Sequence, residues 1–245
     1  METETLLARF VRELAAVDPV AVWAHGSLAG GDYQEGRSDL DLIAMLPGPV
    51  TWGVAWRIAA LHARTRREPL APKLHCTYLT PDTAEDPARR HLTWAHEQLF
   101  RRPVTPVTRA ELHAFGRVLH GKAPVGLLPP VADGQLREFV VREQRDYWRP
   151  AVGRPRLWAE DIWVDLGLLT FARASATVRD GRLISKREAL ELLPGLGAPV
   201  EVVEDIRGRR YDDPPPVTPR WRVRRAGLVR DYLGPAIDAL VASYG

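Results

Sequence analysis

The chain has 245 residues, of which 45% are hydrophobic and 27% are charged, and its net charge at neutral pH is +3. This length and apolar content suffice for one large domain or for two smaller ones with buried cores. The small positive charge gives no support for a nucleic-acid groove, no apolar run approaches the roughly 18 residues of a membrane span, and the lone Cys76 excludes an internal disulfide.

The start of the chain and its cysteine content bear on the compartment. The first ten residues, METETLLARF, are acidic and enter an amphipathic pattern at once, unlike a secretory signal peptide. Together with the single cysteine, this indicates a cytoplasmic protein with no membrane partner. The basic runs at 207–210 and 220–225 are expected on solvated helix faces, so we also expect no nucleic-acid partner.

The first hundred residues alternate between helical and strand patterns. Apolar residues recur at helical spacing near the start, and later short apolar runs with β-branched residues indicate buried strands. In chain order the sequence predicts a helix near 6–14, strands over 19–25 and 39–46, a helix over 52–67, a strand over 73–80 and a helix over 86–100 that carries Trp94.

Beyond residue 103 the helical period dominates. Thr108 and Glu111 have the spacing of a capping box, and Gly121 is placed to stop that helix. The predicted helices cover 108–121, 134–148, 157–178, 185–194 and about 221–243, with a loop over 212–219. The sequence therefore predicts an α+β protein, with a domain over 1–103 built on a small mixed sheet and a helical-bundle domain over 104–245.

One group of residues in the first domain indicates a ligand-binding or catalytic site. Gly26 and Ser27 end one predicted strand, and a turn of this kind presents N–H groups and a hydroxyl to a phosphate. Asp39 and Asp41 lie two residues apart on the next strand, so both carboxylates project from one face, where Mg²⁺ would relieve their repulsion. A phosphate site beside a divalent cation predicts binding of a nucleoside triphosphate. The alternative is a polar turn beside a solvent-facing strand edge.

The same stretch resembles the nucleotidyltransferase superfamily, whose signature is Gly-Ser followed by Asp-x-Asp. More narrowly, GGDYQEGRSDLDL (30–42) and LLTFARASATVRDGRLISKREALELLP (168–194) resemble the streptomycin/spectinomycin adenylyltransferases. Those enzymes pair a nucleotidyltransferase domain with a helical domain and move AMP from ATP to an antibiotic hydroxyl. The resemblance implies the same two-domain fold and a role in antibiotic resistance.

The resemblance also implies roles for individual residues. Gly26 and Ser27 would hold the triphosphate, and Ser38 would add a phosphate contact. Asp39 and Asp41 would be catalytic and would ligate Mg²⁺.

Arg173 and Lys186 match the family's nucleotide-contacting arginine and lysine. Lys186 has independent support, because Ser185 and Glu188 form a capping box that places it in a first helical turn, where a basic side chain opposes the helix dipole unless an anion binds. It is also one of three lysines among 34 basic residues. For Arg173 the structural alternative is a salt bridge to Asp165 or to another acid, and for Lys186 it is a solvated side chain.

The family's third carboxylate has no counterpart here. It would fall near Leu74 on the strand 73–80, which holds no Asp or Glu. His75 can substitute as a general base, since the pKa of histidine lies near neutrality, although a purely structural role for His75 stays open. Glu68 is another possible source of this carboxylate, but it precedes the strand, so the chain would have to bend to bring it to the site.

The candidate binding site for the acceptor molecule lies on one predicted helix of the second domain, residues 157–178. Glu160 and Asp161, with Asp165 one turn later, form an acidic cluster, and Trp158 and Trp163 flank it. Acids beside an aromatic wall suit a cationic aminoglycoside, so Glu160, Asp161 and Trp158 are the candidate acceptor-binding residues. The alternative is an ordinary solvated acidic face.

Taken together, the sequence predicts an enzyme, a Mg²⁺-dependent nucleotidyltransferase that moves AMP from ATP to a hydroxyl of a small molecule, with an aminoglycoside as one candidate acceptor. A monomer or a weak dimer is expected. Two alternatives stay open: a nucleotide-binding homologue with little or no catalytic activity, which the missing carboxylate favours, and a protein-AMPylating enzyme of the toxin–antitoxin type.

Overall fold

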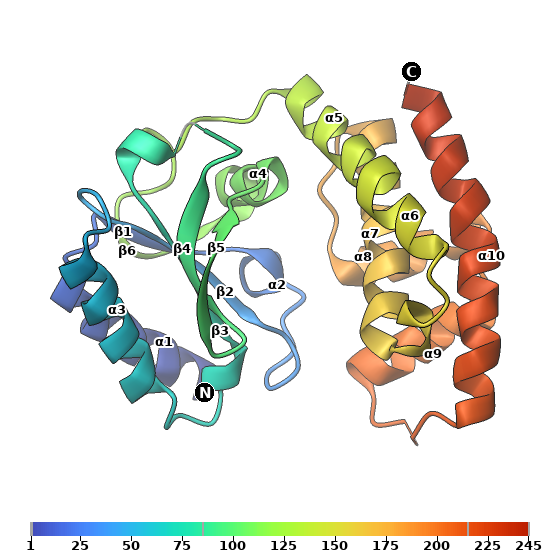
Figure 1. Cartoon of the computed structure of the whole chain (residues 1–245), viewed down its shortest axis with the longest axis horizontal. Coiled ribbons are helices and arrows are strands. Elements are labelled where there is room, and N and C mark those ends of the chain that lie inside the picture. Colours follow the sequence, from blue (N-terminus) through green and yellow to red (C-terminus); the bar gives the residue numbers. More distant parts are fainter. Residues whose placement is uncertain (1, 85, 215, 245) are drawn as a thin grey trace. The chain divides into compact units, whose positions relative to one another are not determined.

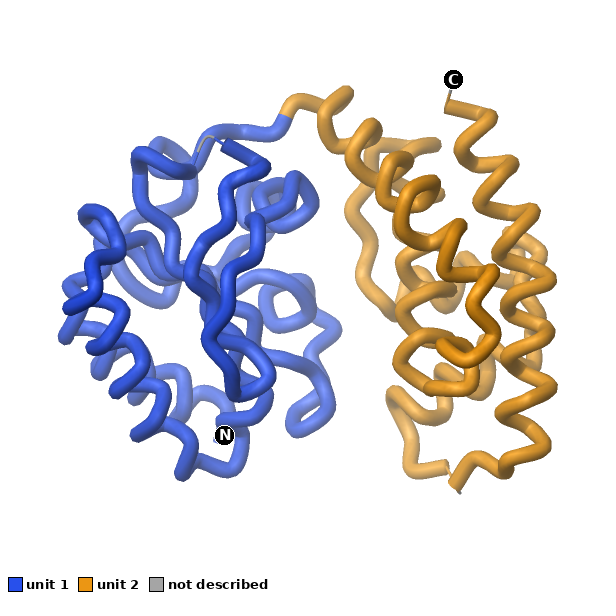
Figure 2. The backbone as a smooth tube through the Cα atoms, in the orientation of Figure 1, with its two compact units in different colours: residues 1–131 blue, residues 132–245 orange. Residues whose placement is uncertain are grey.

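A computed structural model describes residues 2–84, 86–214 and 216–244 (Figure 1). It divides the chain into two compact units, residues 1–131 and 132–245, which are coloured separately in Figure 2. No helix among the described residues is both long and apolar enough to cross a membrane.

The first unit combines helices with a mixed sheet. Its helices are α1 (Glu2–Leu14), α2 (Gly26–Ala29), α3 (Trp52–Thr65) and α4 (Pro106–Phe115), with short 3₁₀ turns at Ala15–Val17, Ala71–Lys73 and Pro81–Thr83. Its strands are β1 (Ala21–Ala24), β2 (Leu40–Met45), β3 (Leu74–Leu79), β4 (Arg90–Ala95), β5 (Gln98–Pro103) and β6 (Arg117–Gly121). Within the described residues they form one six-stranded sheet in the order β5-β4-β3-β2-β1-β6. The strands β2 and β3 are parallel and the other paired strands are antiparallel, which confirms the predicted mixed sheet.

The two faces of the sheet bury different side chains. On β1, Val22 and Ala24 join the core formed with α1 and α3, whereas Trp23 points to the opposite face and joins the core that includes Leu112 of α4. This alternation follows from the two-residue period of a strand. Both faces of the central strands are therefore buried, as their continuous apolar runs indicate.

The predicted helix over residues 86–100 is wrong. The segment forms the strand β4, a turn and the start of β5, and Trp94 pairs with Leu99 across the hairpin. The turn residues His96 and Glu97 both have positive φ angles, 51° and 59°. Hairpin turns of this geometry usually contain Asn or Gly, so the usual turn signal is missing from the sequence.

The predicted domain boundary at residue 103 is also displaced. The segment 104–131 belongs to the first unit, because β6 pairs with β1 and Leu112 and Leu128 are buried in its core. The predicted capping box at Thr108 is wrong, since the side chain of Thr105 caps α4 by accepting the N–H of Thr108. The helix α4 ends at Phe115 and the strand β6 follows it, whereas the sequence predicts a single helix that continues to Gly121.

The second unit is helical throughout its regular structure in the described residues. Its elements are α5 (Asp133–Glu143), a π-helical turn (Gln144–Trp148), α6 (Arg149–Val152), a 3₁₀ turn (Leu157–Ala159), α7 (Asp161–Asp180), α8 (Lys186–Leu192), a second 3₁₀ turn (Pro194–Leu196), α9 (Val200–Tyr211) and α10 (Pro219–Tyr244). The sequence pattern predicts no helix over residues 200–206, where the structure has the first part of α9. The core of the second unit is formed by side chains from α7, α8 and α10, among them Leu168, Leu190 and Leu233.

The basic runs of the second unit are not simply solvated. Arg225 is fully buried and donates to Asp161 at 2.5 Å and to Asp205 at 2.8 Å. Arg209 donates to both oxygens of Asp165 and to Asp205. A buried arginine is tolerated only when it is paired in this way, and the network joins α7, α9 and α10.

Candidate active site

The two aspartates of the predicted motif lie at the start of β2, Asp41 within the strand and Asp39 directly before it. Leu40 and Leu42 point into the core under α1 and α3, so Asp39 and Asp41 project from the opposite face. Farther along that face Ile43 is buried in the core that includes α4. The carboxylate-bearing side chains remain partly accessible, with exposures of 43% for Asp39 and 28% for Asp41. The end of the strand where the core stops is thus the part that a ligand can reach.

The Gly-Ser turn contacts this acidic edge directly. Gly26 has a φ of +62°, and a Cβ atom added there would lie 3.1 Å from Oδ2 of Asp41. The N–H of His25 donates to the carbonyl oxygen of Asp41 at 3.0 Å. Ser27 follows within the single turn α2 and is half-buried. The residues predicted to bind phosphate and to bind metal are therefore brought together in the first unit.

Ser38 has a different local role from the one predicted. It is buried, and its hydroxyl accepts the N–H of Gln34 at 3.1 Å, which closes the loop before β2. Contact of Ser38 with a phosphate stays a prediction, and it would use the hydroxyl hydrogen, which this bond does not.

The strand β3 supplies basic neighbours to both acids. In the parallel register Asp41 lies beside His75, and His75 Nδ1 is 3.4 Å from Oδ1 of Asp41. Two residues before this pair, in the 3₁₀ turn that leads into β3, Lys73 Nζ lies 3.7 Å from Oδ1 of Asp39 and donates to the carbonyl of Arg37. In place of the third carboxylate that the sequence resemblance implies, a histidine and a lysine therefore lie beside the two acids.

These neighbours control the charge of Asp41. Burial alone would raise the pKa of its carboxyl group, but the hydrogen bond with His75 and the electrostatic attraction of His25, His75 and Arg102 outweigh burial and lower the pKa to about 2. Asp41 is consequently ionised throughout the physiological pH range. An ionised carboxylate is the form that a hard cation needs.

A second acid–histidine pair was missed by the sequence analysis. His25 and Glu111 are both buried, and Nδ1 of His25 lies 3.2 Å from Oε2 of Glu111. The sequence places Glu111 in a capping box, which does not point to a contact with His25. The position of His25 directly before Gly26 is the sequence signal that could have indicated a role in the site. Within the described part of the chain, Nε2 of His25 and Nε2 of His75 are buried without a hydrogen-bond partner. Both histidines thus hold one ring nitrogen against an acid, and the other nitrogen is buried without a hydrogen-bond partner.

Glu68, the alternative source of a third carboxylate, is engaged elsewhere. Its side chain is bonded to Arg9 of α1. It therefore makes no contribution to the acidic edge of β2.

The residues at this edge fit a magnesium ion bound together with a polyphosphate. No group of three or more His, Cys, Asp or Glu side chains in residues 2–84, 86–214 and 216–244 could hold a metal ion by itself. Mg²⁺ commonly uses one or two carboxylates and completes its shell with water and substrate phosphates. Asp39 and Asp41, on one strand face and partly exposed, provide that limited set.

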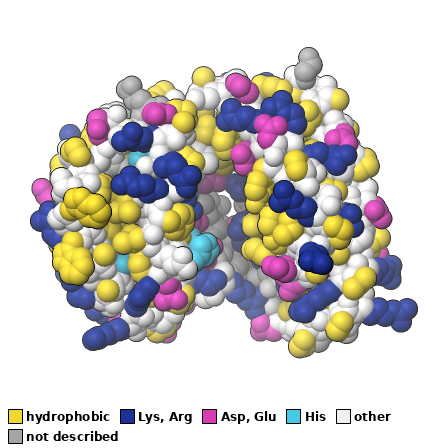
Figure 3. All heavy atoms as spheres, viewed as in Figure 1, with side chains coloured by type: hydrophobic (Ala, Val, Ile, Leu, Met, Phe, Trp, Pro, Cys, Tyr) yellow, Lys and Arg dark blue, Asp and Glu magenta, His cyan; other side chains and the backbone are white. Residues whose placement is uncertain are grey.

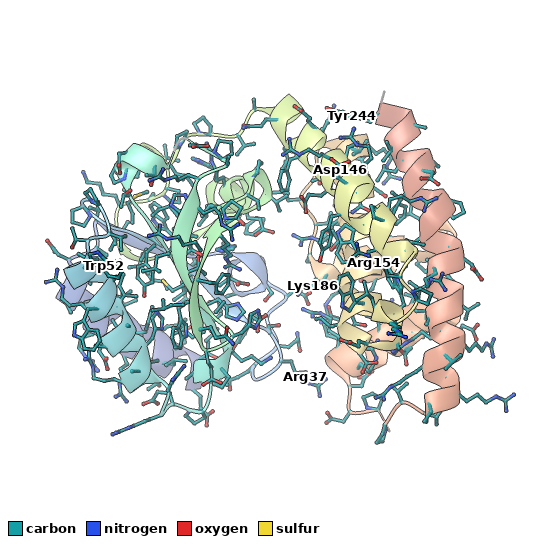
Figure 4. All side chains as sticks on the ribbon, viewed as in Figure 1. Arg37, Trp52, Asp146, Arg154, Lys186 and Tyr244 are labelled. Carbon is teal, nitrogen blue, oxygen red and sulfur yellow. The ribbon has the colours of Figure 1, made fainter. Side chains whose placement is uncertain are left out.

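In the second unit, the local setting of Lys186 agrees with the sequence analysis. The capping box of Ser185 and Glu188 is confirmed, and Lys186 is the first residue of α8, half-buried (Figure 4). Nε of Arg173 donates to the carbonyl of Ile184 at 2.9 Å, so Arg173 is held against the segment that leads into α8. The predicted nucleotide contacts of both residues stay predictions.

The predicted acceptor residues are engaged in the fold of the second unit. Trp158 is fully buried, and its indole N–H donates to the carbonyl of Ala151 at 2.9 Å, which leaves it no surface for a ligand. The carboxylate of Asp161 accepts from Arg225, and its side chain is 40% exposed. Glu160 alone of the three is an exposed acid. The acceptor prediction therefore depends on Glu160 and on the accessible part of Asp161.

Comparison with known proteins shows a similarity of fold. Neither a protein-family model nor a curated protein matches the sequence. The structure is similar to that of spectinomycin adenyltransferase AAD(9) from Enterococcus faecialis, which was solved with ATP and spectinomycin, at a TM-score of 0.66 and 12% sequence identity. The match covers 92% of this chain and 98% of the other. At this identity the similarity concerns the fold, and the chain accordingly has an adenylyltransferase-like α+β fold.

Proposed function

We propose that this protein is a nucleotidyltransferase that moves AMP from ATP to a hydroxyl group of a small molecule. The observation that carries the proposal is the contact between Gly26 and the ionised carboxylate of Asp41. It joins a turn suited to a polyphosphate with a strand edge suited to Mg²⁺. The shared fold with an enzyme solved with ATP and spectinomycin supports the choice of ATP and of an aminoglycoside-like acceptor.

In the proposed reaction the acceptor oxygen forms a bond to the α-phosphorus of ATP, and the bond from that phosphorus to the bridging oxygen breaks. Pyrophosphate leaves, and the hydroxyl proton passes to a base. Asp39 and Asp41 would hold Mg²⁺, which when bound neutralises phosphate charge. We propose that Ser27 positions the triphosphate and that Arg173 and Lys186 contact the nucleotide.

His75 is the proposed base. Because the ionised carboxylate of Asp41 can only accept, it favours the proton on Nδ1 of His75 and leaves a lone pair on the buried Nε2. A general base contributes about 10²–10⁴ in rate. His25 is arranged in the same way against Glu111, so it is the comparison residue for this role.

The proposal is tested by incubating the protein with α-labelled ATP, Mg²⁺ and a panel of aminoglycosides, and by measuring pyrophosphate and labelled acceptor. We expect Asp39→Asn and Asp41→Asn to abolish transfer, and His75→Gln to lower kcat by at least about 100-fold. Asp231→Asn, an exposed carboxylate on α10, is the matched control and should leave transfer unchanged. Equal pyrophosphate release by wild type and by both aspartate variants would refute the proposal.

The alternative of a nucleotide-binding protein without transfer activity is favoured by one observation. Lys73 and His75 stand beside Asp39 and Asp41 where the family would place a further acid. Magnesium-dependent ATP binding with no labelled product across the acceptor panel would establish that alternative. Labelling of a protein instead of a small molecule, detected by intact mass, would establish the AMPylating alternative.

A further inference from the structure

Arg102 of the edge strand β5 reaches across the sheet toward the candidate active site. Lys and Arg side chains are scattered over the visible faces of both units (Figure 3), so an arginine near the surface is not by itself a signal. Arg102 is half-buried, however, and its Nε donates to the hydroxyl of Thr77 on β3 at 3.4 Å. The strand β4 lies between β5 and β3. Because neighbouring strands are about 4.8 Å apart, Arg102 spans about 10 Å of the sheet toward β2.

The guanidinium group lies on the face of the sheet that carries Asp41 and His75. Thr77 follows His75 by two residues on β3, so both side chains project from the same face. His75 is the register partner of Asp41, and its Nδ1 lies 3.4 Å from Oδ1 of Asp41. The pKa of Asp41, which burial alone would raise, is lowered by the hydrogen bond with His75 and by nearby positive charges, of which Arg102 is one. Arg102, Asp41 and His75 therefore line one surface of the first unit.

Most of the hydrogen-bonding capacity of Arg102 is left unused by the protein. A guanidinium group has five N–H donors. Among the residues that the structure describes, its side chain bonds only to Thr77, at a distance longer than is usual for such a bond, and it pairs with no carboxylate. Arg209 and Arg225, in contrast, each pair with two aspartates of the second unit. The two Nη groups of Arg102 are thus donors that an oxyanion could use in a bidentate contact.

The order of the strands indicates which oxyanion is close. The turn with Gly26 and Ser27 follows β1, Asp41 lies on β2, His75 lies on β3, and Arg102 reaches this face from the side of β4 and β5. In the proposed function the turn holds the triphosphate and His75 receives the proton of the acceptor. The α-phosphate is bonded to the departing pyrophosphate and is attacked by the acceptor oxygen, so it lies between these two groups. In that arrangement it is the phosphate group of ATP nearest to Arg102.

We propose that Arg102 donates hydrogen bonds to a non-bridging oxygen of the α-phosphate of ATP, an inference that rests on the proposed function. Charge on this group is redistributed during transfer, and fixed donors aimed at developing charge are a main source of rate acceleration. Arg102 forms no covalent bond and transfers no proton. Its bond to Thr77 holds the side chain in place before ATP arrives, so little reorganisation is needed.

A carboxylate or phosphate on the acceptor is the competing partner for Arg102, because it offers the same kind of oxygen. The two assignments differ in which ligands depend on Arg102. Contact with the α-phosphate affects AMP, ATP and every acceptor alike, whereas contact with the acceptor affects only those acceptors that carry an anionic group.

The first test measures binding without turnover. Isothermal titration calorimetry with AMP and with pyrophosphate, both in the presence of Mg²⁺, compares wild type with Arg102→Gln. We expect the variant to bind AMP at least about tenfold more weakly, since a charge-assisted contact is lost. Pyrophosphate contains no α-phosphate, so its affinity should not change, and its retained binding would also show that the variant is folded.

Arg101→Gln is the matched control. Arg101 is the preceding residue of β5, it is exposed, and its side chain projects from the opposite face of the sheet. This substitution removes the same charge from the same strand and should change neither affinity nor rate. Arg102→Lys keeps the charge without the planar fork and should recover only part of the affinity for AMP.

Turnover gives the second test. Arg102→Gln should lower kcat by about 100-fold with every acceptor that wild type uses, the typical loss for a donor to developing charge. A defect confined to acceptors that bear a carboxylate or phosphate would overturn the proposal, and so would equal loss of AMP and pyrophosphate binding. If wild type binds and transfers AMP while Arg102→Gln behaves like Arg101→Gln, the assignment of Arg102 alone is overturned. If wild type binds neither ATP nor AMP, the proposed function fails together with it.

Discussion

The carboxyl group of Asp41 shows how a single residue is tuned by what surrounds it. It meets Gly26 of the phosphate-type turn on one side and His75 of the neighbouring strand on the other. In the proposed site these contacts would hold the carboxylate in place for a ligand, and they also contribute to stability. The same residue therefore links the folded state to pH.

Lowering the pKa of Asp41 from 3.8 to about 2 makes a definite contribution to the pH dependence of unfolding. Because the pKa is lower in the folded state, the contribution is complete above about pH 4 and is lost as the pH falls toward 2. Its size is about 2 kcal/mol at 1.36 kcal/mol per pKa unit. We expect Asp41→Asn to flatten the fall in the free energy of unfolding between pH 4 and 2, measured by urea denaturation. An unchanged slope would contradict this account.

At the scale of elements, close packing decides which substitutions a helix tolerates at a given position. In α7, a Cβ atom added at Gly167 would lie 2.6 Å from the ring of Trp158, which is fully buried. In α10, a Cβ atom added at Gly227 would meet nothing within 4 Å. The two glycines occupy helices of the same unit and differ mainly in this clearance.

The pair makes a matched prediction. Gly167→Ala should lower the free energy of unfolding by about 1–3 kcal/mol through overpacking against Trp158. Gly227→Ala should raise it by up to about 1 kcal/mol, because alanine has the higher helix propensity. Thermal denaturation of both variants beside wild type measures the difference. Equal effects would show that helix propensity, and not contact with Trp158, decides the outcome.

The elements also show which parts of the fold could be predicted from sequence. The strands β1, β2 and β3 were predicted because each is a short apolar run ended by turn residues, and the motif residues of the first unit came together as a consequence. The β4–β5 hairpin was not predicted, since its turn uses His96 and Glu97 at positive φ instead of glycine. The roles of Glu111 and Asp161 depend on partners 86 and 64 residues away in the chain, His25 and Arg225, which no local pattern reveals.

At the scale of the whole molecule, binding of a ligand is linked to the stability of the folded chain. A ligand that binds only the folded state raises the free energy of unfolding by about 2.7 kcal/mol at a hundredfold excess over its Kd. Nucleotide binding should therefore be visible as a shift in Tm.

We expect ATP with Mg²⁺ to raise the Tm of wild type, and expect Asp41→Asn to abolish the shift. Lys186→Ala should reduce it, whereas Lys122→Ala, a lysine exposed elsewhere in the chain, should leave it intact. Differential scanning fluorimetry with ATP, Mg²⁺ and both together separates the contributions. A full shift in Lys186→Ala would remove Lys186 from the proposed nucleotide contacts.

The basic residues beside the acidic edge have a consequence for the order in which ligands arrive. Asp39 already faces the ammonium group of Lys73, and Asp41 already faces the imidazole of His75. Because the ammonium group of Lys73 already offsets part of the negative charge of this edge, a lone divalent ion gains less electrostatic energy there. The ion would then enter most readily as a preformed complex with the triphosphate, so titrations with magnesium alone should saturate poorly and co-titrations should be strongly synergistic.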